Sequence, residues 1–177
     1  MKHVRGFTIL ACVAFVLGLA SSPVLAKHED KSQQATEYPN STRKAPKLDL
    51  TSEKDQKHLQ EGLDALNKGD TATAQTTLQA LLDGSKSKYA QAVAMRGLAL
   101  IKYRAGDYKG SIALLQKALD NGVLPNDDYF DIEYMLAVAQ QGGGQYQASL
   151  DTLHKWRADG KKETAESYAI EGNDLYR

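Results

Sequence analysis

The chain has 177 residues, and its 22 lysines and arginines are balanced by 22 aspartates and glutamates. This balance lacks the basic excess that attracts nucleic acid, so we expect no nucleic acid partner. A single cysteine in the whole sequence excludes an internal disulfide, so a helical or sheet core must stabilise the fold by itself.

Residues 1–26 have the pattern of a secretory signal peptide. Lys2 and Arg5 give a basic start, residues 7–19 form an almost unbroken apolar run, and the stretch ending at Ala26 supplies a cleavage pattern. A membrane anchor is the alternative, but it needs about 20 apolar residues. Cys12 lies inside the apolar run, which argues against a lipoprotein. We expect cleavage after Ala26, a periplasmic or secreted protein, and no stable membrane insertion.

Residues 27–51 are rich in lysine, serine, glutamine, threonine and proline and contain few apolar residues. A segment of this composition cannot bury enough apolar surface to offset the entropy that it loses on ordering. We therefore predict a flexible, disordered leader between the signal peptide and the folded part.

From residue 52 onward, apolar residues recur at spacings of three and four, which is typical of amphipathic helices. Ser52 followed by Asp55 resembles a helix N-cap, and Asn126 after Pro125 indicates a later helix start. Glycines mark the expected helix ends. The predicted helices cover residues 53–67, 71–82, 87–104, 108–120, 127–141, 146–158 and 163–176.

Three stretches of this region align with one another without a gap when Gly69, Gly106 and Gly144 are superimposed. The spacings of these glycines, 37 and 38 residues, indicate a stacked array of helix pairs. Seven residues before each glycine stands a small residue, and these three are Gly62, Ala99 and Ala137. We expect this column to lie where the two helices of a pair come closest, and to tolerate no larger side chain.

These units resemble the tetratricopeptide repeat (TPR). The second unit is the best match, with a small residue in its first helix, Gly106-Asp107-Tyr108 at its turn, and spaced apolar residues in its second helix. The units are longer than the usual 34 residues, and the proline between repeats is missing. The resemblance implies an all-α fold for residues 52–177, a right-handed helical-hairpin solenoid of about three TPR-like repeats plus a C-terminal helix. It also implies a concave groove lined by the first helix of each repeat.

The last predicted helix has two interpretations. Gly172 follows Ala137 by 35 residues and so continues the column of small residues. The helix is then either a terminal cap with a polar outer face or the first half of a further repeat. In the second case Ile170, Leu175 and Tyr176 remain partly uncovered for another protein.

No constellation for catalysis, cofactor binding or metal binding is present in the sequence. His28, His58 and His154 each stand alone, and the His-x-x-x-His spacing of zinc enzymes is absent. Trp156 occupies the column of apolar residues in the second helices, which predicts core packing and not ligand binding. We therefore expect no catalytic, cofactor-binding or metal-binding residues.

The remaining candidate is the groove, where apolar and aromatic residues flank two arginines. Such side chains combine buried area with hydrogen-bond donors and suit an extended peptide or a partner helix, although packing against neighbouring helices explains part of the pattern equally well. The predicted partner-binding residues are Arg96, Leu100, Tyr103, Arg104, Tyr134, Val138 and Gln141, with Leu59, Leu63 and Leu66 in the first repeat.

The functional hypothesis is a non-catalytic scaffold or adaptor of the bacterial periplasm or cell envelope, whose partner is a protein or peptide of unknown identity. The alternative is an accessory subunit of an envelope enzyme complex, in which the helical array positions a catalytic protein.

Overall fold

The computed structural model describes residues 36–46 and 52–177. The predicted signal peptide, the predicted cleavage after Ala26 and the rest of the predicted leader lie outside the described residues. No helix within the described ranges is long and apolar enough to cross a membrane. The helices are α1 (Glu53–Asn67), α2 (Thr71–Gly84), α3 (Lys88–Arg104), α4 (Tyr108–Asp120), α5 (Asn126–Gly142), α6 (Tyr146–Gly160) and α7 (Ala165–Leu175).

The described part of the chain is all-α, as the sequence predicts, and the helix bounds agree with the predicted ones to within two residues. Ser52 caps α1 as expected, because its hydroxyl accepts a hydrogen bond from the backbone N–H of Asp55 at 3.1 Å. The start of α5 differs from the expectation. Pro125 is its N-cap, and the side chain of Asn126 is free to make contacts elsewhere.

Three helix-to-helix turns have the same backbone geometry. Gly69, Gly106 and Gly144 adopt φ angles of 79°, 78° and 74°, a left-handed conformation that residues with a Cβ rarely adopt. In each turn the N–H of the next residue bonds to the carbonyl five residues before it, as in the 2.9 Å bond from Asp70 to Ala65. This is a Schellman motif. It explains why glycine stands at the same place in α1–α2, α3–α4 and α5–α6.

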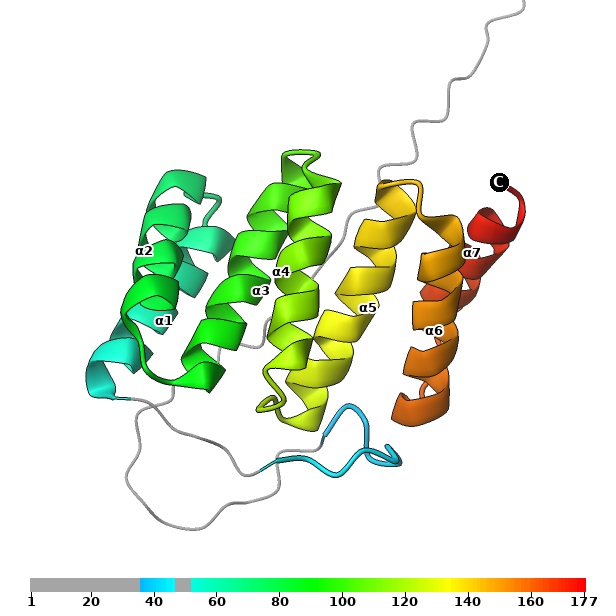
Figure 1. Ribbon diagram of the computed structural model, residues 1–177, viewed down its shortest axis with the longest axis horizontal. Helices are drawn as coiled ribbons and strands as arrows, with labels where there is room; N and C mark the ends of the chain where they lie inside the picture. The colour runs from blue at the N-terminus through cyan, green and yellow to red at the C-terminus, as the bar shows by residue number, and fades with distance from the viewer. Residues whose placement is uncertain (1–35, 47–51) are drawn as a thin grey trace, which may run out of the picture. The chain divides into compact units, whose positions relative to one another are not determined.

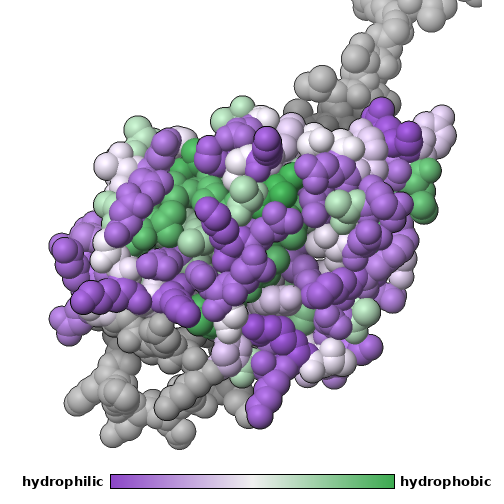
Figure 2. Space-filling view, in the orientation of Figure 1, coloured by the Kyte–Doolittle hydropathy of each residue, from purple (hydrophilic) through white to green (hydrophobic). Residues whose placement is uncertain are grey.

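Each helix packs against the next one along the chain, and Figure 1 shows the helices side by side in chain order from α1 and α2 to α7. Buried aliphatic side chains between successive helices form the core. The visible face in Figure 2 is largely polar, with hydrophobic side chains gathered over the part from α2 to α4.

The small-residue column occupies positions of close helix contact. A Cβ atom at Gly62 would lie 2.6 Å from Cδ2 of Leu78 on α2, and Ala99 and Ala137 have no exposed surface. Gly172 differs, because no atom lies within 4 Å of the place where its Cβ would be. Neighbouring side chains therefore pack closely around the first three small residues of the column, whereas Gly172 on α7 has free space beside it.

The outer side of α7 carries exposed hydrophobic residues. Tyr168 is 49% exposed, Leu175 70% and Tyr176 91%, and Ile170 is half-buried. Leu175 and Tyr176 are two of the residues that only the half-repeat interpretation expects to be uncovered. Both interpretations of the last helix stay predictions.

The prediction of a disordered leader needs correction for residues 36–46, which we call the leader segment. Tyr38 is only 3% exposed and belongs to a buried cluster with Phe130 of α5 and Trp156 of α6. The average composition of residues 27–51 did not indicate this docking. One aromatic side chain inserted into a core can stabilise a docked segment even when its neighbours in sequence are polar.

Candidate functional site

The predicted partner-binding residues form what we call the predicted strip, with Arg96, Leu100, Tyr103 and Arg104 on α3 and Tyr134, Val138 and Gln141 on α5. The two helices are linked by side chains. The Arg96 guanidinium lies 3.5 Å from a carboxylate oxygen of Asp128 and 3.6 Å from one of Asp131, both on α5. Arg96 thus has intramolecular partners, which the sequence alone did not indicate.

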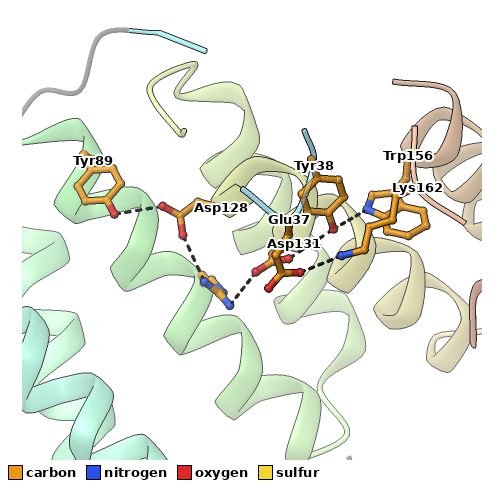
Figure 3. A network of polar contacts seen from close by, with 8 residues as sticks. Glu37, Tyr38, Tyr89, Asp128, Asp131, Trp156 and Lys162 are labelled. Atoms are coloured by element: carbon orange, nitrogen blue, oxygen red, sulfur yellow. Dashed lines mark hydrogen bonds and ion pairs between the residues drawn. The ribbon is translucent and has the colours of Figure 1, made fainter. Parts of the chain in front are cut away.

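A tyrosine extends this ion-pair network on its α3 side. The hydroxyl of Tyr89 donates a 3.1 Å hydrogen bond to Asp128, and Figure 3 shows its ring directed at that carboxylate. Burial and the Asp128 charge raise the pKa of Tyr89, so the hydroxyl keeps its proton and remains a donor. Burial also raises the pKa of Asp131, and the Arg96 charge opposes that shift. The network joins α3 to α5 through charged side chains that are partly buried.

The strip residues near the C-terminal end of α3, which are Leu100, Tyr103 and Arg104, have fewer partners within the protein. Leu100 packs half-buried against the core, and the Tyr103 ring meets the Tyr108 ring edge-on with centroids 5.5 Å apart. Burial raises the pKa of Tyr103. Arg104 is exposed at the end of α3. Tyr103 and Arg104 therefore remain the members of the strip best placed to meet a partner.

The α5 half of the strip is mostly engaged in the fold. The Tyr134 ring lies 5.1 Å from that of Trp156, and Val138 is half-buried. The Gln141 amide donates to the backbone oxygen of Ile170 at 3.1 Å and to Asp174 at 2.7 Å. Gln141 thus holds α7 in place, which is a structural role that the sequence analysis did not foresee.

The leader segment forms a second candidate site, which the sequence analysis missed. The Tyr38 ring lies 4.8 Å from the Phe130 ring and 6.0 Å, edge-on, from the Trp156 ring. Its hydroxyl accepts a hydrogen bond from the Trp156 indole N–H at 3.2 Å and lies 3.5 Å from Asp131. Burial raises the pKa of Tyr38, so the hydroxyl stays neutral. We call the set of residues that surround the Tyr38 side chain, which are Phe130, Asp131, Trp156, Gly160 and Lys162, the Tyr38 pocket.

Arg43 holds the other part of the leader segment. Its guanidinium donates to the backbone oxygen of Leu124 at 3.0 Å and to the side chain of Asn126 at 2.9 Å, and it lies 4.1 Å from the Tyr129 ring centroid. The Asn126 amide donates in return to the backbone oxygen of Arg43 at 3.1 Å. The side chain at the start of α5 therefore binds the leader segment.

Two contacts near the end of α6 complete the docking. Lys162 pairs with Glu37 at 2.8 Å and lies 4.4 Å from the Tyr38 ring centroid. The backbone N–H of Thr42 donates to the carbonyl of Asp159 at 2.8 Å. A signal for this site existed in the sequence, because Tyr38 is the one aromatic residue between positions 27 and 51.

The two candidate regions contain aromatic rings, ion pairs and backbone hydrogen-bonding groups. Across residues 36–46 and 52–177, no group of three or more His, Cys, Asp or Glu side chains is placed to hold a metal ion. No protein-family model matches this sequence, and no curated protein is significantly similar to it.

Proposed function

We propose that this protein is a non-catalytic binding scaffold of the bacterial periplasm or cell envelope, which holds a partner polypeptide against its helices. The observation that carries the proposal is the docked leader segment. Residues 36–46 form neither helix nor strand, yet Tyr38 is anchored between α5 and α6. Helices that hold one segment without helix or strand have rings and donors that suit another polypeptide.

The proposal includes a repeat architecture. α1–α2, α3–α4 and α5–α6 form three TPR-like hairpins of a right-handed solenoid, and α7 follows as a C-terminal helix. The common turn at Gly69, Gly106 and Gly144 supports the architecture, as does the column of small residues. In such an array the first helices would line a concave face, and we propose that the predicted strip on α3 and α5 lies in that groove.

Substitution of the α3 end of the strip tests this function. We expect Tyr103→Ala and Arg104→Ala to weaken capture of the partner by about thirtyfold or more, because truncating a hot-spot aromatic or arginine costs about 2 kcal/mol of binding. The measurement is quantitative crosslinking in a periplasmic extract, followed by identification of the captured protein.

The matched control is Lys117→Ala, at an exposed position on α4 outside the strip. It should bind the partner as the native chain does, and Arg104→Ala should unfold within about 0.5 kcal/mol of the native chain. Equal capture by all of these variants would show that the strip is not a binding surface. A stoichiometric partner that is itself an enzyme would assign the protein to an accessory role in an enzyme complex.

Export is the second part of the proposal, and it rests on the sequence of residues 1–26. We expect the mature protein to begin at Lys27 and to be recovered without lipid from the periplasm. N-terminal sequencing and intact mass of the purified native protein measure this. Recovery of a chain that still begins at Met1 in the membrane fraction would contradict the export proposal and would leave the binding proposal intact.

A further inference from the structure

We infer that the Tyr38 pocket is a docking site for short peptides anchored by tyrosine, and that the leader segment, which turns after Tyr38, is its resident ligand, which an external peptide of the same pattern can replace. The inference rests on the proposed binding function and specifies the ligand class of a second site. It commits to a partner peptide that carries an acidic residue before a tyrosine and an arginine five positions after that tyrosine.

The pocket is formed by parts of the chain far from the leader segment. Phe130 and Asp131 belong to α5, Trp156 and Gly160 to α6, and Lys162 to the turn before α7. Figure 3 shows Tyr38 directed between Asp131 and Trp156, with Lys162 beside it. Because residues 130–162 supply the whole wall, the site does not need the ligand to be covalently connected.

Glycine at position 160 makes room for the ring. A Cβ atom at Gly160 would lie 3.0 Å from Cδ1 of Tyr38 and 3.5 Å from Cδ1 of Phe130. The 3.0 Å distance to Tyr38 is tighter than an ordinary van der Waals contact, whereas the distance to Phe130 is ordinary. A side chain on residue 160 would therefore compete with the tyrosine for the same space.

Polar groups in the pocket select tyrosine over other aromatic residues. The indole N–H of Trp156 donates to the Tyr38 hydroxyl at 3.2 Å inside a buried cluster. Phenylalanine would fill the same volume and leave this N–H without an acceptor, so a peptide with phenylalanine in place of the tyrosine should bind at least about fivefold more weakly. The site therefore prefers tyrosine to phenylalanine because only tyrosine has a hydroxyl oxygen that accepts this hydrogen bond.

Charges on either side of the tyrosine fix the direction of the peptide. Lys162 pairs with Glu37, which immediately precedes the anchor. Arg43 donates to the backbone oxygen of Leu124 and to Asn126. An acidic residue before the tyrosine and an arginine after it therefore match the site in one orientation only.

The connection of the leader segment to the same chain explains how the pocket stays filled. A tethered ligand competes at an effective concentration on the order of 1 mM when its linker is short and flexible. An external peptide therefore binds the native chain with an apparent affinity that is reduced by the fraction of molecules with an empty pocket. Removing the Tyr38 anchor from the full chain should open the pocket.

The experiment uses the full mature chain carrying Tyr38→Ala and a synthetic peptide with the sequence TEYPNSTRKAP, residues 36–46. Trp156 is the only tryptophan in the chain and lies in the pocket, so its fluorescence reports occupancy, and calorimetry gives the affinity. We expect saturable binding to Tyr38→Ala and binding at least about tenfold weaker to the native chain. A peptide with alanine in place of its tyrosine should bind about thirtyfold more weakly or worse.

Two glycine variants provide the matched control in the Tyr38→Ala chain. Gly160→Leu fills the pocket and should abolish peptide binding, whereas Gly172→Leu on α7 has no atom within 4 Å of its Cβ and should leave binding unchanged. An Arg43→Ala chain keeps the tyrosine anchor and weakens the leader segment, so it should bind the peptide with intermediate affinity.

The inference is overturned if a helical, cooperatively melting Tyr38→Ala chain binds no peptide, or if Arg43→Ala binds it no better than the native chain does. Equal binding to Gly160→Leu and Gly172→Leu would also overturn it. Tyr103→Ala, in the predicted strip, should bind the peptide normally, so failure of the pocket and failure of the strip give different results.

Discussion

Replacing Leu78 by alanine is expected to lower the free energy of unfolding by about 3 to 5 kcal/mol, at the upper end of leucine truncations. Leu78 on α2 has no exposed surface, and its methyl groups fill the space left by two glycines, Gly62 on α1 and Gly97 on α3. The cavity in Leu78→Ala would be lined by helix backbone, which cannot relax inward as side chains can. Urea denaturation followed by far-UV circular dichroism measures the change.

A second substitution makes this test specific. A Cβ at Gly97 would lie 2.5 Å from Cδ1 of Leu78, so Gly97→Ala overpacks the native core and should cost about 1 to 3 kcal/mol. In the Leu78→Ala chain the added methyl enters vacated space, and the same substitution should stabilise. Gly172→Ala, which meets no atom within 4 Å, is the control. If Gly97→Ala has the same sign in both backgrounds, the three residues do not pack as described.

Replacing Lys155 by methionine is expected to cost about 3 kcal/mol at neutral pH, because it leaves a buried carboxylate without its cation. Glu133 on α5 is 3% exposed, and Lys155 on α6 forms an ion pair with it. The lysine side chain is itself half exposed, so water reaches that side of the pair and keeps the loss at the lower end for buried ion pairs.

The loss should depend on pH with a definite sign. Burial raises the pKa of Glu133 in the folded protein, and Lys155 opposes this. A carboxyl whose folded pKa is raised costs stability above its unfolded pKa, and protonation relieves that cost as the pH falls through the folded value. Without Lys155 the folded pKa rises further, so the difference between Lys155→Met and the native chain should shrink as the pH is lowered towards 5.

Two controls accompany the Lys155 experiment. Lys57→Met disrupts an exposed pair with Glu61 on α1 and should change stability by less than about 0.5 kcal/mol at either pH. The double variant Glu133→Leu with Lys155→Met removes both charges and should recover most of the loss. A Lys155→Met chain as stable as the native one, or a loss that does not vary with pH, would contradict the role assigned to Glu133.

The sequence by itself determined the helices and the turns between them. The spacing of apolar residues locates all seven helices described here, because a helix needs one apolar face and its period is visible in the chain. The turns were equally predictable. Gly69, Gly106 and Gly144 stand where the backbone adopts a left-handed conformation, which is a local requirement and so leaves a local signal.

The predicted strip was identified only as a set of residues on neighbouring helices, because periodicity gives the face of a helix and not the partners of each side chain. Arg96 and Gln141 read as free recognition groups in the sequence. In the tertiary structure they are paired with Asp128, Asp131 and Asp174. Those partners lie 32 or more residues away on other helices, and no local pattern connects them.

The docking of the leader segment could be seen only in the tertiary structure. Composition averages over a segment, and the residues around Tyr38 are too polar to predict burial. The central anchor is one ring that packs against Phe130 and Trp156, which are far along the chain. Sequence thus fixes local conformation, where each residue acts through its neighbours, whereas the filling of the pocket depends on side chains that only folding brings together.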